Sequence, residues 1–349
     1  MGRHVRWWFA LLTVMALTFT GARAQSESAS EYVAFRIDDR RLLATVLIRE
    51  STPPQIRDGL SPPPVARFGY SYFTVPPWWQ DRPFVVPSPG PWSVHLSPGS
   101  LIGATAEQVV GGYVACQEAV GVILRVDPND SELLARSRAR YFVASPFSAI
   151  DRPTAASSPV GTLRAPVSAE WQASIEALLD SLLARELPRV RSEAAQALST
   201  METSTVGYHR SWARERRRVE AAMERNEGRR QYDVQAFQLG PGAPVYFVRA
   251  EWLVQGRQGF AASLWLRTEP AVEVIETNVR PASWLRMFEF QGRVTREHLG
   301  MVLNVLDRDQ DGWGEVLFLE SGYEGFRISL RRYSPAGFVT SGPSYGGGC

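Results

Sequence analysis

The chain of 349 residues contains no lysine, so all 38 of its basic side chains are arginine. A Walker A nucleotide-binding loop, a Schiff-base enzyme and a protein kinase each require a lysine amine, and these three classes are excluded. Histidine is scarce as well, and its four copies lie too far apart in the sequence to form a local metal-binding motif. The chain therefore lacks the side chains on which several common enzyme mechanisms depend.

Cysteine occurs only twice, at Cys116 and Cys349. An oxidising compartment would permit a disulfide between them, because the glycines at 346–348 would let Cys349 reach a distant partner. A buried, unreactive Cys116 with a free terminal thiol is the alternative, and spacing does not decide between the two. Cys116 and Cys349 are therefore candidates for a disulfide.

The apolar run near the start of the chain is too short for a membrane-spanning helix, which needs about 20 residues. Trp7–Phe19 follows a basic start and precedes the small-residue sequence Ala22-Arg23-Ala24. This order is typical of a secretory signal peptide. We predict a signal peptide at 1–24, no transmembrane segment after its cleavage, and a periplasmic or secreted location.

Cleavage after Ala24 would remove three arginines and no acidic residue, leaving 35 arginines against 36 acids. A protein that binds nucleic acid keeps a surplus of positive charge in its working form. We therefore expect no nucleic-acid partner. The expected partner is an envelope or extracellular protein, or a polysaccharide.

The order of apolar patterns predicts an α+β protein, with antiparallel β-rich N- and C-terminal parts separated by a central helical pair. Near the C-terminal end, Val245–Val254 and Phe260–Arg267 flank a glycine-containing loop and predict an antiparallel hairpin. The predicted segments after the signal peptide are a flexible lead at 25–31, a β-rich domain with Pro- and aromatic-rich loops at 32–165, a helical segment at 166–231, an antiparallel β domain with an ion-binding loop at 232–340, and a Gly-rich tail at 341–349.

Two helices are predicted in the middle of the chain. Apolar residues recur every three or four positions over Ser168–Glu186, and Pro188 is expected to end this helix. A second helix is predicted over about Thr205–Asn226, and it carries many arginines with glutamates between them. These charges indicate either a solvated surface with Glu–Arg pairs or an anion-binding face. The candidate anion-binding residues are Arg214, Arg217, Arg218 and Arg225.

Residues 53–91 contain 11 of the 24 prolines, and Trp78, Trp79 and Trp92 lie in or next to this stretch. Proline favours loops and edge strands over regular structure. Tryptophans exposed on such loops would stack on sugars, whereas tryptophans folded inward would cover a small core.

The segment Asp307–Glu315 has the pattern of a calcium-binding loop. Aspartates at positions 1, 3 and 5 supply carboxylates, glycine at position 6 allows a sharp turn, and an acid stands at position 9. The position-7 ligand would be a main-chain carbonyl. Position 12 is Phe318, and the flanks read as strands, so the loop is not an EF-hand. The predicted Ca2+ ligands are Asp307, Asp309, Asp311, Trp313 and Glu315.

With strands on both sides and an acid at position 9, this single loop resembles the calcium loops of integrin-type FG-GAP and VCBS repeat proteins. The resemblance covers about 20 residues and one copy of the motif. It implies a structural ion held in a β-hairpin.

The sequence favours an exported, non-enzymatic protein with a structural calcium site, acting as an envelope or extracellular interaction protein. One alternative is a calcium-stabilised secreted hydrolase, which would need carboxylates that converge in a cleft. The other is a carbohydrate-binding module that uses the Trp78, Trp79 and Trp92 region.

Overall fold

The structure is a computed structural model that describes residues 31–47, 66–68, 71–74, 90–97, 99–114, 117–146, 160–163, 169–225, 227–254, 257–268, 272–281, 299–321 and 325–348. The predicted signal peptide lies outside these residues, and so do Trp78, Trp79, Cys116 and Cys349. In the described part of the chain, no helix is both long enough and apolar enough to cross a bilayer.

Six antiparallel strands of the N-terminal half form a closed ring, in the order β6-β5-β8-β1-β2-β7, and β7 pairs again with β6. The ring closes because β6 is 15 residues long, so its first part pairs with β5 while most of its length pairs with β7. β3 and β4 extend this sheet from the second part of β6. The bounds are β1 Tyr32–Arg36, β2 Arg41–Leu47, β3 Ala66–Phe68, β4 Ser71–Thr74, β5 Pro91–Ser97, β6 Ser100–Val114, β7 Gln117–Val126 and β8 Tyr141–Pro146.

The interior of the ring is filled by apolar side chains, because alternate residues of a strand point to opposite faces. Ala34 of β1 points inward, whereas its neighbours Val33 and Phe35 belong to a cluster on the outer face. The short helix α2 (Ser131–Arg136) adds Leu134 to the interior. Among the described residues, Trp92 is the largest fully buried side chain.

The C-terminal sheet is a meander of four antiparallel strands in the order β14-β15-β16-β17. A five-stranded antiparallel sheet, β13-β12-β11-β10-β9, lies beside it. The bounds are β9 Gly161–Leu163, β10 Arg229–Gln238, β11 Val245–Val254, β12 Arg257–Arg267, β13 Glu273–Pro281, β14 Met301–Leu306, β15 Glu315–Ser321, β16 Gly325–Ser334 and β17 Gly337–Gly348. The antiparallel hairpin predicted from Val245–Val254 and Phe260–Arg267 is thus confirmed as β11 and β12.

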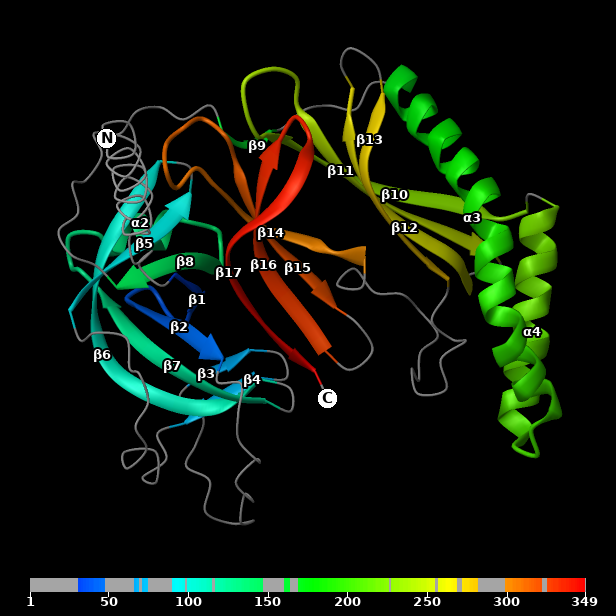
Figure 1. The fold of residues 1–349 in the computed structure, drawn as a ribbon, viewed down its shortest axis with the longest axis horizontal. Coiled ribbons are helices and arrows are strands. Elements are labelled where there is room, and N and C mark those ends of the chain that lie inside the picture. Colours follow the sequence, from blue (N-terminus) through cyan, green and yellow to red (C-terminus); the bar gives the residue numbers. More distant parts are fainter. Residues whose placement is uncertain are drawn as a thin grey trace, which may run out of the picture.

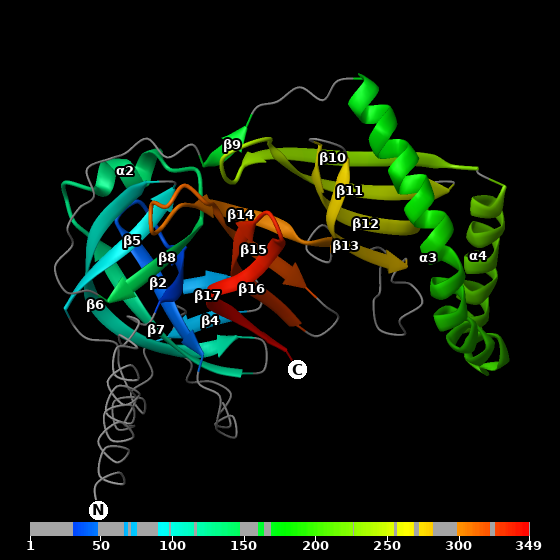
Figure 2. The ribbon, with the colours of Figure 1, turned by 45° about the horizontal axis from the view of Figure 1, so that its top comes forward.

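The C-terminal sheet is a middle layer that is buried on both faces. Leu306 and Leu317 pack with Phe35 and other residues on the outside of the ring. Their neighbours Val305 and Val316 pack against the five-stranded sheet instead. Figures 1 and 2 show the resulting order of layers, from the ring through the C-terminal sheet and the five-stranded sheet to the helices.

The helices α3 (Ala169–Thr203) and α4 (Gly207–Glu224) pack side by side, which confirms the predicted helical pair. Ile175, Leu179 and Leu182 of α3 pack on the face of the five-stranded sheet that lies opposite the C-terminal sheet. The prediction that Pro188 ends the first helix is wrong, because α3 continues for 15 residues beyond it. Proline removes one helical hydrogen bond, and we attribute the continuation to the packing of α3 against α4 and the sheet.

Candidate metal centre

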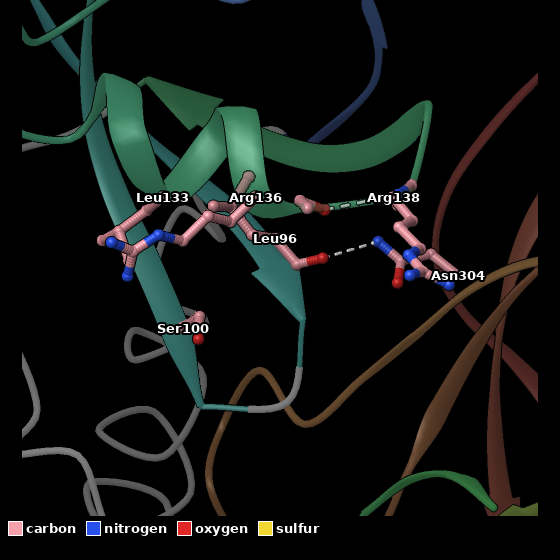
Figure 3. Close-up of a pocket in the computed structure, with 8 residues that line it drawn as sticks. Leu96, Ser100, Leu133, Arg136, Arg138 and Asn304 are labelled. Carbon is pink, nitrogen blue, oxygen red and sulfur yellow. Dashed lines mark hydrogen bonds between the residues drawn. The ribbon is translucent and has the colours of Figure 1, made fainter. Parts of the chain in front are cut away.

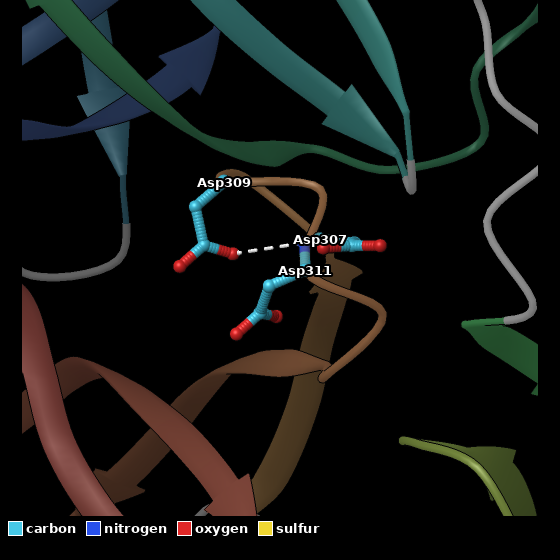
Figure 4. Close-up of side chains that lie close together, drawn as sticks. All are labelled: Asp307, Asp309 and Asp311. Carbon is cyan, nitrogen blue, oxygen red and sulfur yellow. Dashed lines mark hydrogen bonds between the residues drawn. The ribbon is translucent and has the colours of Figure 1, made fainter.

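The predicted ion-binding loop connects β14 to β15, the first two strands of the C-terminal sheet. Carboxylate oxygens of Asp307, Asp309 and Asp311 lie within 4.8 Å of one another. Asp307 is buried at the base of the loop, whereas Asp309 and Asp311 are more exposed (Figure 4). The structure therefore contains a group of three carboxylates that can hold a metal ion.

Two residues with left-handed backbone conformations reverse the loop. Gln310 has a φ angle of 56° and Gly312 a φ angle of 82°. Between them, the Asp311 carboxylate accepts a hydrogen bond of 2.9 Å from the backbone N–H of Trp313. Only glycine adopts such a conformation without steric cost, which explains Gly312. The reversal keeps the carboxylates of Asp307, Asp309 and Asp311 close together.

Arg332 of β16 provides a positive charge at this loop. Its guanidinium donates to Oδ2 of Asp309 at 3.3 Å and also to Oδ2 of Asp311. Arg332 lies directly across the sheet from Glu315 in the pairing of β15 with β16. A guanidinium that bridges two carboxylates lowers their mutual repulsion, so the loop is partly neutralised by the protein itself.

Glu315 is completely buried and lies apart from the group of three aspartates. Its Oε2 accepts the backbone N–H of Arg308 at 3.1 Å, and its Oε1 has no hydrogen-bond partner among the described residues. Burial raises the pKa of Glu315 to about 7. The hydrogen bond from Arg308 acts in the opposite direction, but its effect is smaller. Glu315 thus supports the base of the loop, and its predicted role as a direct ligand stays a prediction.

The loop lies where all three sheets meet. Arg308 forms an ion pair with Glu31, which immediately precedes β1 of the ring. Gly314 donates its N–H to the carbonyl of Leu239, next to β10 of the five-stranded sheet, at 2.9 Å. In β14, just before the loop, the Asn304 side chain donates to the carbonyls of Leu96 and Tyr141 of the ring, at 2.9 and 3.0 Å. Any ion bound here would act on the joint between the layers.

Trp313 packs its indole against the same joint. The indole lies over Gly240, close enough that a Cβ on that glycine would come within 2.5 Å of the ring. It also contacts Tyr333 of β16, with ring centroids 6.2 Å apart. The indole therefore has a packing role in addition to the ligand role predicted for the Trp313 carbonyl.

The charges around the loop remain unbalanced. Among the described residues, the carboxylates of Glu31, Asp307, Asp309 and Asp311 lie near the guanidinium groups of Arg308 and Arg332. The buried Glu315, whose pKa is raised to about 7, adds only part of a negative charge at neutral pH. The sequence pattern did not indicate Glu31, Arg308 or Arg332, because Glu31 and Arg332 come from distant parts of the chain and arginine is not a ligand of the calcium-loop pattern. The excess negative charge favours a cation at the group of three aspartates.

The predicted anion-binding face lies on the exposed surface of α4, but two of its four arginines already have partners. Arg217 forms a bidentate pair with Glu202 at 2.6 and 3.1 Å, and Arg225 does the same with Glu227. Arg218 is 3.9 Å from Glu215 and 82% exposed, and Arg214 is exposed. Of the four predicted residues, Arg214 and Arg218 are therefore the ones whose charge is most available to a partner.

Trp92 is not available for stacking on a sugar, because its side chain is buried inside the ring. This corrects the interpretation of Trp92 as part of a carbohydrate-binding surface. The indole lies inside the ring because Trp92 occupies an inward-facing position of β5, as Val94 and Leu96 of the same cluster do. Trp78 and Trp79 lie outside the described residues.

No family model, curated protein or solved structure matches this chain. The resemblance to FG-GAP and VCBS proteins therefore rests on the loop alone.

Proposed function

We propose that this chain is an exported, non-enzymatic interaction protein of the cell envelope or extracellular space, in which one Ca2+ ion stabilises the joint between three sheets. The observation that carries the proposal is the convergence of Asp307, Asp309 and Asp311 at that joint. Carboxylate oxygens are hard ligands, which favour Ca2+ over softer metals. The signal-peptide pattern at 1–24 supports export.

The expected strength of binding fits an extracellular environment. Extracellular calcium modules have dissociation constants of about 0.1–1 mM. At about 1 mM free Ca2+, such a site stabilises the folded state by roughly 0.4–1.4 kcal/mol through mass action. The ion would bind Asp309 and Asp311 in place of the Arg332 guanidinium, since both groups use the same carboxylates.

Thermal unfolding of the mature protein tests this proposal. We expect the melting temperature to be higher in about 5 mM CaCl2 than in chelator, and the increase to disappear in Asp309→Asn. Asp39→Asn is the matched control, because Asp39 is also exposed and paired with an arginine, at 2.9 Å from Arg36, but lies far from the loop in the sequence. A calcium response equal in all three proteins, or absent from the wild type, would refute the metal site.

Arg332→Gln tests whether the Arg332 guanidinium competes with Ca2+ for Asp309 and Asp311, as distinct from a general effect on folding. Without Arg332, two carboxylates lose their internal counter-charge, so the calcium-free protein should be less stable. The same variant should bind Ca2+ several-fold more tightly, because the ion no longer displaces a guanidinium. Weaker calcium binding in Arg332→Gln would contradict the proposed arrangement.

We further propose that the exposed arginines of α4 contact an acidic polysaccharide. Arg210, Arg214 and Arg218 are four residues apart, which places them along one side of the helix with a rise of about 6 Å per step. A row of guanidinium groups at this spacing suits a linear chain of anionic sugars. The apolar side of α4 is occupied by packing, as shown by buried His209, Ala213 and Ala222.

Retention on a heparin column is the measurement for this contact. The double variant Arg214→Gln and Arg218→Gln should elute at lower salt than the wild type, because two exposed charges are lost. The double variant Arg40→Gln and Arg125→Gln, which removes two exposed arginines of the ring, is the control. Equal loss of retention in the two double variants would show that only net charge matters.

A further inference from the structure

A hollow of about 380 Å3 lies between α2, the β5–β6 hairpin and β14. Its volume is within the range of about 300–1,000 Å3 that is typical of small-molecule sites. Leu133, which is 44% exposed, provides apolar surface, whereas Leu96 is 3% exposed and its carbonyl accepts from Asn304 at the edge of the hollow. Figure 3 shows Arg136 and Arg138 on opposite sides of this hollow, with Ser100 and Asn304 also at its edge.

The charged groups of the hollow are all positive. None of its lining residues carries a carboxylate. Arg138 is exposed and forms no ion pair within the part of the chain that the structure describes, and Arg136 pairs only with the exposed Glu132 of its own helix. The Asn304 amide is occupied, since it donates to Leu96 and Tyr141 and accepts the N–H of Val305. The arginines are therefore the groups left to bind a ligand.

The two arginines are not needed to complete α2. Arg36 of β1 already donates to the carbonyls of Leu134 and Ser137 at the end of this helix, at 2.7 and 2.8 Å. Carbonyls at a helix C-terminus are the usual partners of nearby arginines. Because Arg36 fills this role from β1, Arg136 and Arg138 are not required at these carbonyls, and both line the hollow.

We propose that this hollow binds a small organic anion that carries a carboxylate or a phosphate group beside a short apolar part. The planar guanidinium binds either group through two parallel hydrogen bonds. The apolar part would lie against Leu133. The bound molecule would contact both the ring and Asn304 of the C-terminal sheet, so binding would also stabilise the joint between them.

Calorimetric titration of the full mature protein with four probes tests the proposal. The probes are acetate, hexanoate, inorganic phosphate and phenyl phosphate, at constant ionic strength. We expect saturable binding, with at least one apolar-tailed probe about tenfold tighter than its small counterpart, since several buried methylenes or a phenyl ring exceed that gain. Tighter binding of hexanoate would identify a carboxylate as the anionic group, and tighter binding of phenyl phosphate would identify a phosphate. No saturable binding by any probe overturns the proposal.

Two variants with the same change of charge locate the site. Arg138→Gln should weaken binding of the preferred probe by about tenfold or more, because a charge-assisted bidentate contact is lost. Arg140→Gln removes another exposed arginine only two residues away that does not line the hollow, and it should leave the affinity unchanged. Equal weakening in both variants would assign the effect to general electrostatics and overturn the proposed site. Matching melting curves without probe confirm that both variants are folded.

Discussion

Trp92→Ala is expected to lower the free energy of unfolding by about 3–5 kcal/mol, the usual cost of removing a fully buried aromatic side chain. Trp92 is 0% exposed and lies among the inward side chains of the ring, with the Tyr32 ring 5.7 Å away. The strands of the ring are hydrogen-bonded on both sides, so they cannot move inward to fill the cavity. Chemical denaturation followed by circular dichroism measures the loss.

Trp92→Phe is the appropriate comparison. It keeps an aromatic ring in the interior and removes the indole N–H, which is buried without a hydrogen-bond partner among the described residues. The expected loss is below about 2 kcal/mol, because less volume is lost and an unsatisfied donor disappears. A cost below about 1 kcal/mol for Trp92→Ala would mean that the ring interior is not a packed core.

The contribution of His95 to stability is expected to fall by about 2–3 kcal/mol as the pH is lowered from about 6.5 to about 4. Burial, assisted by the nearby positive charge of Arg308, lowers the pKa of His95 from 6.5 to about 4. Between these values the unfolded chain binds a proton that the folded chain does not. Acid therefore favours unfolding over this range, and the loss is complete once the folded state is also protonated.

Comparison of the wild type with His95→Gln isolates this effect. The wild-type curve alone does not, because the raised pKa of Glu315, about 7, acts in the opposite direction over nearly the same range. A carboxyl that is protonated in the folded state favours folding as the pH falls. In chelator, the stability difference between the two proteins should change by about 2–3 kcal/mol from pH 7 to pH 4. A constant difference would show that the pKa of His95 is ordinary.

The elements that follow from local sequence were predictable. The hairpin of β11 and β12 depends on two apolar runs around a short loop, and the structure places both strands there. The three aspartates of the ion loop are likewise only two residues apart, so a local pattern suffices to bring them together. Local spacing determines these features because the interacting residues are neighbours in the chain.

The features that escaped prediction depend on distant contacts. Closure of the ring requires β6 to pair with both β5 and β7, which a run of apolar residues does not reveal. Arg332 reaches the ion loop from the next hairpin, and Glu31 reaches it from the other end of the chain. Pro188 was expected to end a helix because proline breaks isolated helices, whereas packing against a sheet and α4 maintains α3.

The position of the C-terminal sheet as the middle layer has a consequence for biogenesis. Its strands begin only at Met301, yet they cover apolar surface on both the ring and the five-stranded sheet. During synthesis, both of those surfaces remain open to solvent until the last strands have emerged. A chain interrupted before that point would expose two apolar surfaces, which are prone to aggregation. The apolar surfaces of the ring and of the five-stranded sheet are therefore covered only once residues 301–348 have folded against them.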